Sequence, residues 1–275
     1  MLPLFVVDAF TNEPFRGNPA AVCVLPDGTA PGDAWMLAVA AEMKHSETAF
    51  VRRRAADGDW DLRWFTPAVE VDLCGHATLA SAHVLTTEGF ADPGAPLRFH
   101  TRSGVLPARP AGDGRIELDF PALASEPTDA AALRAAVADA LGAEPIAIAR
   151  NVHDLLAELA DAASVRDLAP DFAAIAAIDT RAVVVTAVSD DPAFDFVSRC
   201  FGPRVGIDED PVTGSAHCAL APYWAPRVGR AELVGRQVSA RGGTVHCTLV
   251  TDTGDDDRVL LGGTAVTVTR GALLG

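Results

Sequence analysis

The feature that most constrains the fold of this 275-residue chain is a similarity between short motifs in its two halves. Gly-His-Ala at residues 75–77 and Gly-Ser-Ala at residues 214–216 each begin an expected helix, and a shift of 139 residues places one on the other. The same shift places Arg-Ser-Gly at residues 102–104 on Arg-Gly-Gly at residues 241–243. Two matches at one shift indicate a duplicated unit. A duplicated α+β unit generally puts a shared site where its two copies face each other.

The spacing of apolar residues and the turn signals predict strands and helices in both halves. The expected strands are residues 4–10, 20–25, 48–51, 60–65, 97–101, 104–109, 115–120, 181–188 and 193–201. The expected helices are residues 32–43, 75–88, 128–142 and a segment from residue 214 onward. We therefore predict an N-terminal lobe of residues 1–121, completed by a C-terminal strand at about residues 263–275, and a C-terminal lobe of residues 122–262.

The overall charge argues against two classes of binding partner. The formal net charge is −15 and the pI is about 4.7. Nucleic acids and anionic membranes are both bound by basic surface, so the charge argues against either partner. Any site for an anionic substrate must be local, built from backbone N–H groups or a few arginines.

The cysteines and the apolar segments indicate the cellular compartment in which the protein is expected. Five cysteines without a CxxC pair predict reduced thiols rather than a disulfide framework or a structural zinc site. The first residues lack the basic segment of a signal peptide, and no apolar run reaches the roughly 18 residues of a membrane span. We therefore expect a cytoplasmic protein.

The two glycine-containing helix starts are candidate anion sites. The N-terminus of a helix presents free N–H groups and a partial positive charge, which bind carboxylates or phosphates without a lysine or arginine. One helix start considered alone could equally be an ordinary helix terminus, capped by Thr213, Ser215 or their neighbours. A pair of starts related by a repeat favours the anion site.

Three titratable residues are candidates for proton transfer. His76, in the first helix start, could act as a general acid or base near neutral pH, or could be a structural histidine. Asp210 precedes Pro211 near the second helix start, where it could be a cap, and spacing does not choose it over the adjacent Glu209. Glu47 lies between a helix and an apolar strand, where a carboxylate is often only a strand-edge charge. Burial in a cleft would suit it to proton transfer.

The sequence contains neither a metal-binding motif nor a nucleotide fingerprint. His76 and His83 could share a helix face, but no third ligand is in view and there is no HExxH motif. The GxGxxG, Walker A and GxSxG motifs are also absent. We therefore predict that the protein uses no metal and no cofactor.

Five ordered blocks of the sequence resemble the PhzF-like family of phenazine-biosynthesis proteins. The blocks are residues 8–11 with 15–22, then 46–50, 63–67, 74–78 and 206–217. The matches run from about residue 6 to residue 243, which is most of the chain. The segment from about residue 122 to residue 180 carries no motif of this kind.

The resemblance implies a diaminopimelate-epimerase-like fold, in which two similar α+β lobes each wrap a sheet around a central helix, with the active site in the cleft between them. The phenazine-pathway member of the family isomerises a dihydro-hydroxyanthranilate without metal or cofactor. The matching catalytic residues here are Glu47, His76, Asp210 and Ser215, with Glu47 as the base that takes a proton from carbon and returns it elsewhere on the substrate. The matching substrate-binding residues are Gly75, Ala77, Thr213, Gly214 and Asn18. The resemblance also implies a small carboxylate-bearing substrate and a homodimer.

Two other functions stay open. Racemases and epimerases of this fold use two opposed cysteines, but here Cys74 has no counterpart before Gly214, and Cys218 lies four residues beyond that glycine. Because half of the thiol pair is missing, an amino-acid racemase or epimerase ranks below a carboxylate-based isomerase. Cys74 is then a small packing residue. A binding or interaction protein without turnover is the third alternative.

Overall fold

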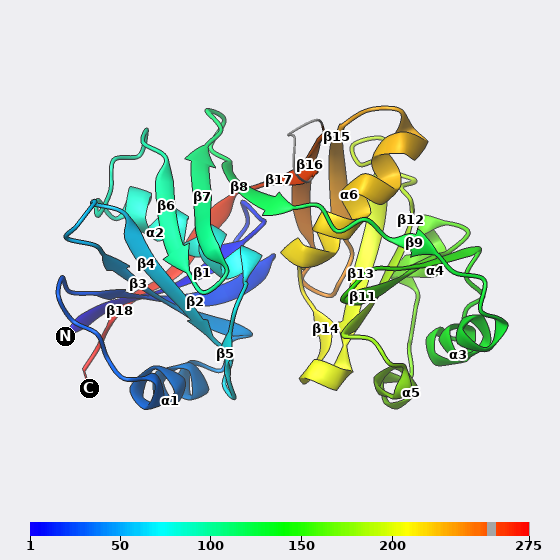
Figure 1. Cartoon of the computed structure of the whole chain (residues 1–275), viewed down its shortest axis with the longest axis horizontal. Helices are drawn as coiled ribbons and strands as arrows, with labels where there is room; N and C mark the ends of the chain where they lie inside the picture. The colour runs from blue at the N-terminus through cyan, green and yellow to red at the C-terminus, as the bar shows by residue number, and fades with distance from the viewer. Residues whose placement is uncertain (252–256, 275) are drawn as a thin grey trace. The chain divides into compact units, whose positions relative to one another are not determined.

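The computed structural model describes residues 1–251 and 257–274. The chain divides into two compact lobes (Figure 1). The first lobe contains Met1–Asp119 and residues 262–274, and the second contains Phe120–Leu261. Each lobe combines a mixed sheet with a buried helix, so the predicted α+β class is confirmed. No helix within the described ranges has the length and apolar character needed to cross a membrane.

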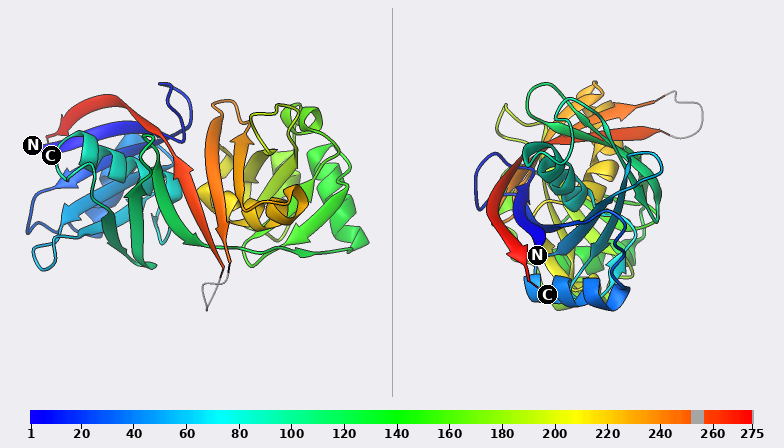
Figure 2. Two further views of the ribbon diagram at one scale, coloured as in Figure 1. Left: turned by 90° about the horizontal axis from the view of Figure 1, so that it is seen from above. Right: turned by 90° about the vertical axis from the view of Figure 1, so that its left-hand side faces the viewer.

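The sheet of the first lobe contains both ends of the chain. β1 (Leu2–Ala9) lies between β2 (Asn18–Leu25) and β18 (Ala265–Leu273) and is antiparallel to both. Leu2 is opposite Leu273, so the two ends of the chain lie side by side, as Figure 2 shows.

The remaining strands of this lobe extend the sheet beyond β2. The order is β2 parallel to β3 (Glu47–Arg53), β3 antiparallel to β4 (Trp60–Phe65), β4 parallel to β6 (Leu97–Thr101), and β6 antiparallel to β7 (Gly104–Pro110), which is antiparallel to β8 (Ile116–Pro121). A two-residue strand, β5 (Glu70–Val71), pairs with β4.

A helix buried on nearly all sides forms the centre of the first lobe. α2 (Gly75–Thr87) contacts β1, β2, β3 and β18. Its small residues, including Ala77, Ala80 and Ser81, are fully or almost fully buried and let the strands approach the helix axis. A helix enclosed in this way needs no polar face. The other helix, α1 (Asp33–Met43), packs through Met36 and Val39 on a separate apolar cluster of the sheet.

The second lobe repeats the strand pattern of the first. β11 (Asp154–Glu158) is parallel to β12 (Ala182–Val188), β12 is antiparallel to β13 (Phe196–Gly202), β13 is parallel to β15 (Glu232–Gln237), and β15 is antiparallel to β16 (Gly243–Val250). This is the succession of β2, β3, β4, β6 and β7. β10 (Ala147–Arg150) pairs with β11 as β1 pairs with β2, and α6 (Gly214–Val228) is the counterpart of α2. The prediction of two similar lobes is therefore confirmed.

The other elements of the second lobe are peripheral or short. They are β9 (Glu126–Pro127), α3 (Ala131–Leu141), α4 (Ala162–Arg166), α5 (Phe172–Ala177), the 3₁₀ turn η1 (Pro203–Val205), β14 (Ile207–Asp210) and β17 (Arg258–Gly263).

The start of α3 differs from the prediction. The sequence predicts that Thr128 and Asp129 cap a helix ending at Gly142, whereas the cap residue is Ala130 and α3 begins at Ala131. Pro127 pairs with Ala149 of β10, and the backbone N–H of Thr128 donates to the Ile148 carbonyl at 3.0 Å. The strand pairing through Pro127 and the hydrogen bond of Thr128 keep the chain out of the helix at this point, and residues 128–130 belong to neither element. The sequence does not predict β10, β11, α4 or α5.

The core beside α6 contains a buried histidine. His217 donates through Nδ1 to the Thr213 carbonyl oxygen at 2.8 Å, and its Nε2 has no hydrogen-bond partner in the described part of the chain. Its ring lies 5.8 Å from that of Phe196, which stacks on Trp224 at 6.0 Å. Burial lowers the pKa of His217 to about 4, although the hydrogen bond to Thr213 opposes the shift. His217 is therefore neutral at pH 7.

The substitution Gly235→Ala should destabilise the second lobe. A Cβ at this position of β15 would lie 2.5 Å from two ring atoms of Phe196 and 3.1 Å from Nε2 of His217. Because both rings are fully buried, we expect a loss of about 1–3 kcal/mol in the free energy of unfolding, measured by chemical denaturation. Gly271→Ala is the control, since that strand glycine has only one neighbouring atom, at 3.9 Å. Equal stability of the two variants would contradict this packing.

The neutral His217 should make the fold sensitive to acid. Its unfolded pKa is near 6.5 and its folded pKa is about 4, so the unfolded chain binds the extra proton between these values. Stability contributed by His217 is complete above pH 6.5 and falls by about 3 kcal/mol as the pH drops to 4. His217→Gln should flatten the pH dependence of unfolding by this amount, and His153→Gln, at an exposed position, should not. Parallel pH profiles for wild type and His217→Gln would refute the assignment.

Candidate active site

Four polar side chains of the first lobe surround the start of α2. His76 is the second residue of this helix, and its Nε2 lies 3.3 Å from Oε2 of Glu47. On the other side of the ring, Nδ1 lies 3.3 Å from Nδ2 of Asn18 and 3.5 Å from Sγ of Cys74. The structure therefore brings together three of the residues predicted for the site, with Cys74 as a fourth.

The topology of the sheet explains why these residues meet. Asn18 begins β2 and Glu47 begins β3, and the two strands are parallel with Ala20 opposite Glu47. Parallel strands start at the same edge of a sheet. The N-terminus of α2 lies at that edge, so His76 reaches both side chains.

Burial fixes the charge state of His76. Its side chain is 6% exposed, and that of Glu47 is 13% exposed. Burial, with a smaller contribution from the neighbouring His45, lowers the pKa of His76 to about 3. The imidazole is therefore neutral at pH 7. With the amide nitrogen of Asn18 donating to Nδ1, the ring proton lies on Nε2, which faces Glu47.

The second lobe holds another predicted group at the start of α6. The Oγ1 of Thr213 donates to Oδ2 of Asp210 at 2.6 Å. Gln237, fully buried in β15, accepts from the Thr213 backbone N–H at 2.8 Å and donates to the Asp210 carbonyl at 2.7 Å. Gln237 thus fixes the turn that carries Asp210 and Thr213. No motif in the sequence points to Gln237.

The structure also separates Asp210 from its neighbour Glu209. Both carboxylate oxygens of Glu209 accept from Arg199, at 2.7 and 2.9 Å. Glu209 is therefore committed to an ion pair, while Asp210 lies beside Thr213. This arrangement supports the choice of Asp210 that the resemblance makes.

Neither central helix is capped by a side chain. The cap residues are Cys74 in α2 and Thr213 in α6, and neither side chain accepts a hydrogen bond from the first turn. The Thr213 hydroxyl is directed to Asp210 instead. The arrangement differs from ordinary Ser or Thr capping, in which the cap side chain binds a backbone N–H of the first turn. The predicted use of Gly75 and Gly214 in binding stays a prediction.

Ser215, the second residue of α6, contacts an arginine outside the predicted set. Nη2 of Arg181 donates to Oγ of Ser215 at 3.0 Å. The same guanidinium donates to both carboxylate oxygens of Asp154, at 2.8 and 2.5 Å. The sequence places Arg181 at the start of an expected strand, residues 181–188, and offers no other signal that would have identified it.

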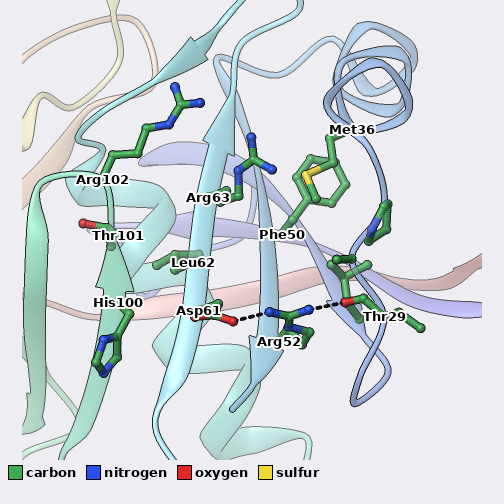
Figure 3. Close-up of a pocket in the computed structure, with 13 residues that line it drawn as sticks. Thr29, Met36, Phe50, Arg52, Asp61, Leu62, Arg63, His100, Thr101 and Arg102 are labelled. Atoms are coloured by element: carbon green, nitrogen blue, oxygen red, sulfur yellow. Dashed lines mark hydrogen bonds and ion pairs between the residues drawn. The ribbon is translucent and has the colours of Figure 1, made fainter.

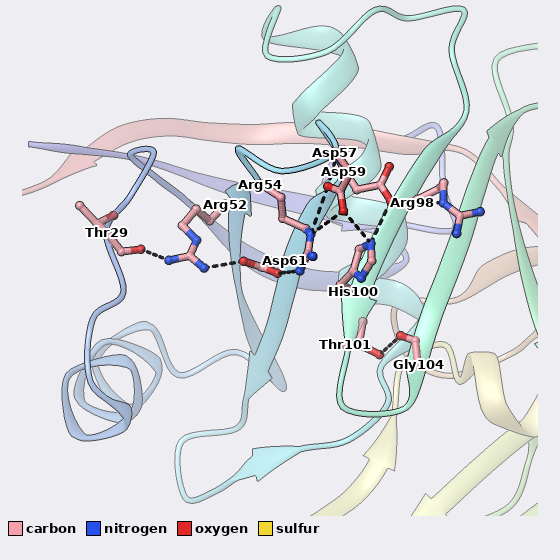
Figure 4. Close-up of polar contacts among 10 residues, drawn as sticks. All are labelled: Thr29, Arg52, Arg54, Asp57, Asp59, Asp61, Arg98, His100, Thr101 and Gly104. Carbon is pink, nitrogen blue, oxygen red and sulfur yellow. Dashed lines mark hydrogen bonds and ion pairs between the residues drawn. The ribbon is translucent and has the colours of Figure 1, made fainter.

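Among the residues that the structure describes, two groups of side chains have the donor atoms for a metal ion. Ligand atoms of Glu47, Cys74 and His76 lie within 4.8 Å of one another. So do those of Asp57, Asp59 and His100 (Figure 4), where His100 Nε2 is 2.8 Å from Asp59. The first group coincides with the predicted proton-transfer residues. The second consists of ordinary surface ion pairs.

The histidine pair considered in the sequence does not converge. His83 Nε2 lies 3.1 Å from the hydroxyl of Thr267 in β18, so its ring is used in packing the helix on the sheet.

A pocket of about 370 Å³ opens elsewhere on the first lobe (Figure 3). Its apolar lining includes Phe50 and Leu62, and three arginines line its polar part. Each arginine is paired with acid: Arg52 with Asp61, and Arg63 and Arg102 both with Glu70. None of the predicted catalytic or binding residues lines this pocket.

Comparisons with known proteins identify the family. Residues 7–271 match the family model of phenazine biosynthesis-like proteins. An uncharacterized isomerase from Halalkalibacterium halodurans is 48% identical over 272 residues, which cover 99% of this chain and 98% of that protein. The crystal structure of a PhzF-family phenazine biosynthesis protein from Enterococcus faecalis has a TM-score of 0.89 at 40% identity and covers 99% of both chains.

A more distant structure supports the fold alone. A probable proline racemase from Agrobacterium radiobacter superposes with a TM-score of 0.64 at 12% identity, covering 99% of this chain and 93% of its own. The predicted diaminopimelate-epimerase-like fold, which proline racemases share, is confirmed. With the family model covering nearly all of its length, the chain belongs to the phenazine biosynthesis-like family, the PhzF family that its motifs predict.

Proposed function

We propose that this protein is an isomerase that moves a proton on a small carboxylate-bearing substrate, with Glu47 as the acid–base group. The observation that carries the proposal is the contact of the Glu47 carboxylate with a neutral, buried His76. The names of its relatives support an isomerase, since the protein from Halalkalibacterium halodurans is named as one.

Glu47 suits proton transfer because of its surroundings. Its side chain is largely shielded, and the neighbouring imidazole of His76 is uncharged at pH 7. The carboxylate can take a proton from a substrate carbon, and the resulting acid can return it to another carbon. A shielded site also limits exchange of that proton with water.

The remaining predicted residues would bind and orient the substrate. His76, with its proton on Nε2, can donate a hydrogen bond to Glu47 or to a developing anion. Asp210 and Ser215 offer an acceptor and a hydroxyl at the start of α6. Asn18, Ala77 and Thr213 would shape the positions of these groups, and the backbone N–H groups of Gly75 and Gly214 would bind the carboxylate.

The two-thiol racemase is a weaker proposal. Cys218, the thiol nearest in sequence to the second motif, is buried in α6, and burial raises its pKa to about 12. It cannot act as the second acid–base group near neutral pH. Cys74 contacts the proposed site through His76. Cys200, opposite Asp210 across β13 and β14 and hydrogen-bonded to Thr213, is buried, and burial raises its pKa.

The substitution Glu47→Gln should abolish proton transfer. We expect deuterium incorporation from D₂O into a panel of amino acids and cyclic carboxylic acids to fall at least about 100-fold, because the amide cannot accept the carbon-bound proton. NMR measures the incorporation. Glu42→Gln, an exposed glutamate of α1, is the matched control. Exchange at the wild-type rate in Glu47→Gln would remove Glu47 from this role, and a wild-type protein that exchanges no member of the panel would count against the isomerase itself.

The substitution Cys74→Ala separates the two chemistries. Carboxylate-based isomerisation should retain exchange within about tenfold, whereas two-thiol racemisation should lose it by orders of magnitude. Cys23→Ala controls for removal of a buried thiol elsewhere in the same lobe. Loss of exchange in Cys74→Ala alone would favour the racemase.

A further inference from the structure

The registers of the two sheets align the lobes residue by residue. In the first lobe Thr48 of β3 is opposite Phe65 of β4. In the second lobe Val183 of β12 is opposite Phe201 of β13. Both phenylalanines are followed, two residues later, by a proline. Thr48 and Val183 therefore occupy the same position in the repeated unit.

This alignment shows what replaces Glu47 in the second lobe. Its counterpart is Ala182, which has no polar side-chain atom. The preceding residue, Arg181, supplies the charged group instead. Arg181 contacts Ser215, the second residue of α6, just as Glu47 contacts His76, the second residue of α2. Beside the second residue of the central helix, one lobe thus has a carboxylate next to an imidazole, and the other has a guanidinium next to a hydroxyl.

We propose that Arg181 is a positioning residue, which Asp154 holds against Ser215 so that the serine hydroxyl donates its proton to a carboxylate of the substrate. The inference deepens the proposed function and rests on it for the identity of the ligand as a carboxylic acid. It assigns Arg181 no contact with the reacting atoms.

The Asp154 pair fixes the guanidinium. Asp154 is 1% exposed, whereas the side chain of Arg181 is 39% exposed. Two hydrogen bonds in the planar fork leave the arginine little freedom to rotate. Although burial opposes its charge, the hydrogen bond to Asp154 raises the pKa of Arg181 above its usual value. The guanidinium is therefore charged and fixed at every pH of interest.

The direction of the hydrogen bond determines the role of Ser215. Arginine has five donors and no acceptor, so Ser215 Oγ must accept from Nη2 of Arg181. A hydroxyl that accepts from a cation is polarised, and its own proton is left to donate to another group. Ser215 is only partly buried, so a ligand can reach it. The ligand group that the Ser215 hydroxyl selects is therefore a hydrogen-bond acceptor, and an anionic oxygen is the strongest acceptor of this kind.

A cysteine introduced at residue 215 tests whether Arg181 gives this position a preference for a carboxylate. The test requires no knowledge of the substrate. In the Ser215→Cys variant, the new thiol is alkylated by iodoacetate, which carries a carboxylate, or by neutral iodoacetamide. The five native cysteines are buried, and the wild-type protein measures their background. The rate ratio of the two reagents cancels the thiolate fraction and reports the local preference for a carboxylate. The pH dependence of the iodoacetamide rate gives the thiol pKa.

With Arg181 present, we expect a thiol pKa below the usual value of about 8.5. Adding Arg181→Met should raise that pKa by at least one unit and lower the iodoacetate preference at least fivefold. Arg166→Met is the matched control, since Arg166 is 40% exposed and forms a comparable two-bond pair with Asp190. It should change the ratio less than twofold. An unchanged pKa and ratio on loss of Arg181 would overturn the proposal.

A second variant guards against misfolding. Arg181→Met leaves the Asp154 carboxylate buried without its cation, which could unfold the lobe. Asp154→Asn combined with Arg181→Gln removes both charges and should give the same loss of carboxylate preference. Because the alkylation needs no turnover, failure of the deuterium exchange would remove the proposed isomerase and leave this result standing. Normal exchange with an unchanged alkylation ratio would remove only the role of Arg181.

Discussion

The structure depends on enclosing one helix in each lobe, with the start of that helix at the edge where two parallel strands begin. Small residues such as Ala77 and Ala216 allow the enclosure, and the parallel pairs β2–β3 and β11–β12 bring two strand starts to one place. A backbone enclosed this way presents its first N–H groups where side chains of both strands converge. The site follows from the packing of the sheet around the helix, and loop conformation contributes little to it.

The four longest helices, most strands of the first lobe, and β12 and β13 of the second could be predicted from the sequence, because apolar periodicity and turn residues determine them locally. The matching motifs that begin at Gly75 and Gly214 also predicted the repeated lobe. Arg181 and Gln237 could not be found in this way. Each acts through a partner 24 to 34 residues distant, Ser215 for Arg181 and Thr213 for Gln237, and a register sets that contact. The α3 start was misplaced for the same reason, since pairing with β10 overrides the local preference for helix.

The two lobes share a topology and differ in the chemistry at the equivalent position. In the first lobe burial removes charge, since the imidazole of His76 stays neutral. In the second lobe burial is compensated by a complete ion pair between Arg181 and Asp154. A neutral setting is compatible with a carboxylate that exchanges protons, whereas a fixed cation holds a hydroxyl in one orientation. The two lobes therefore share one arrangement of strands around a helix and differ in the side chains placed at its start.

The pairing of β1 with β18 also has a consequence for how the chain is made. The second lobe is a continuous segment, and all of its residues leave the ribosome before the last strand of the first lobe does. The first sheet has an unpaired edge at β1 until β18 has been synthesised, so the inserted lobe can mature earlier. A short linker between the adjacent ends, with new termini cut in an exposed turn, should therefore yield a circular permutant in which the first lobe is contiguous.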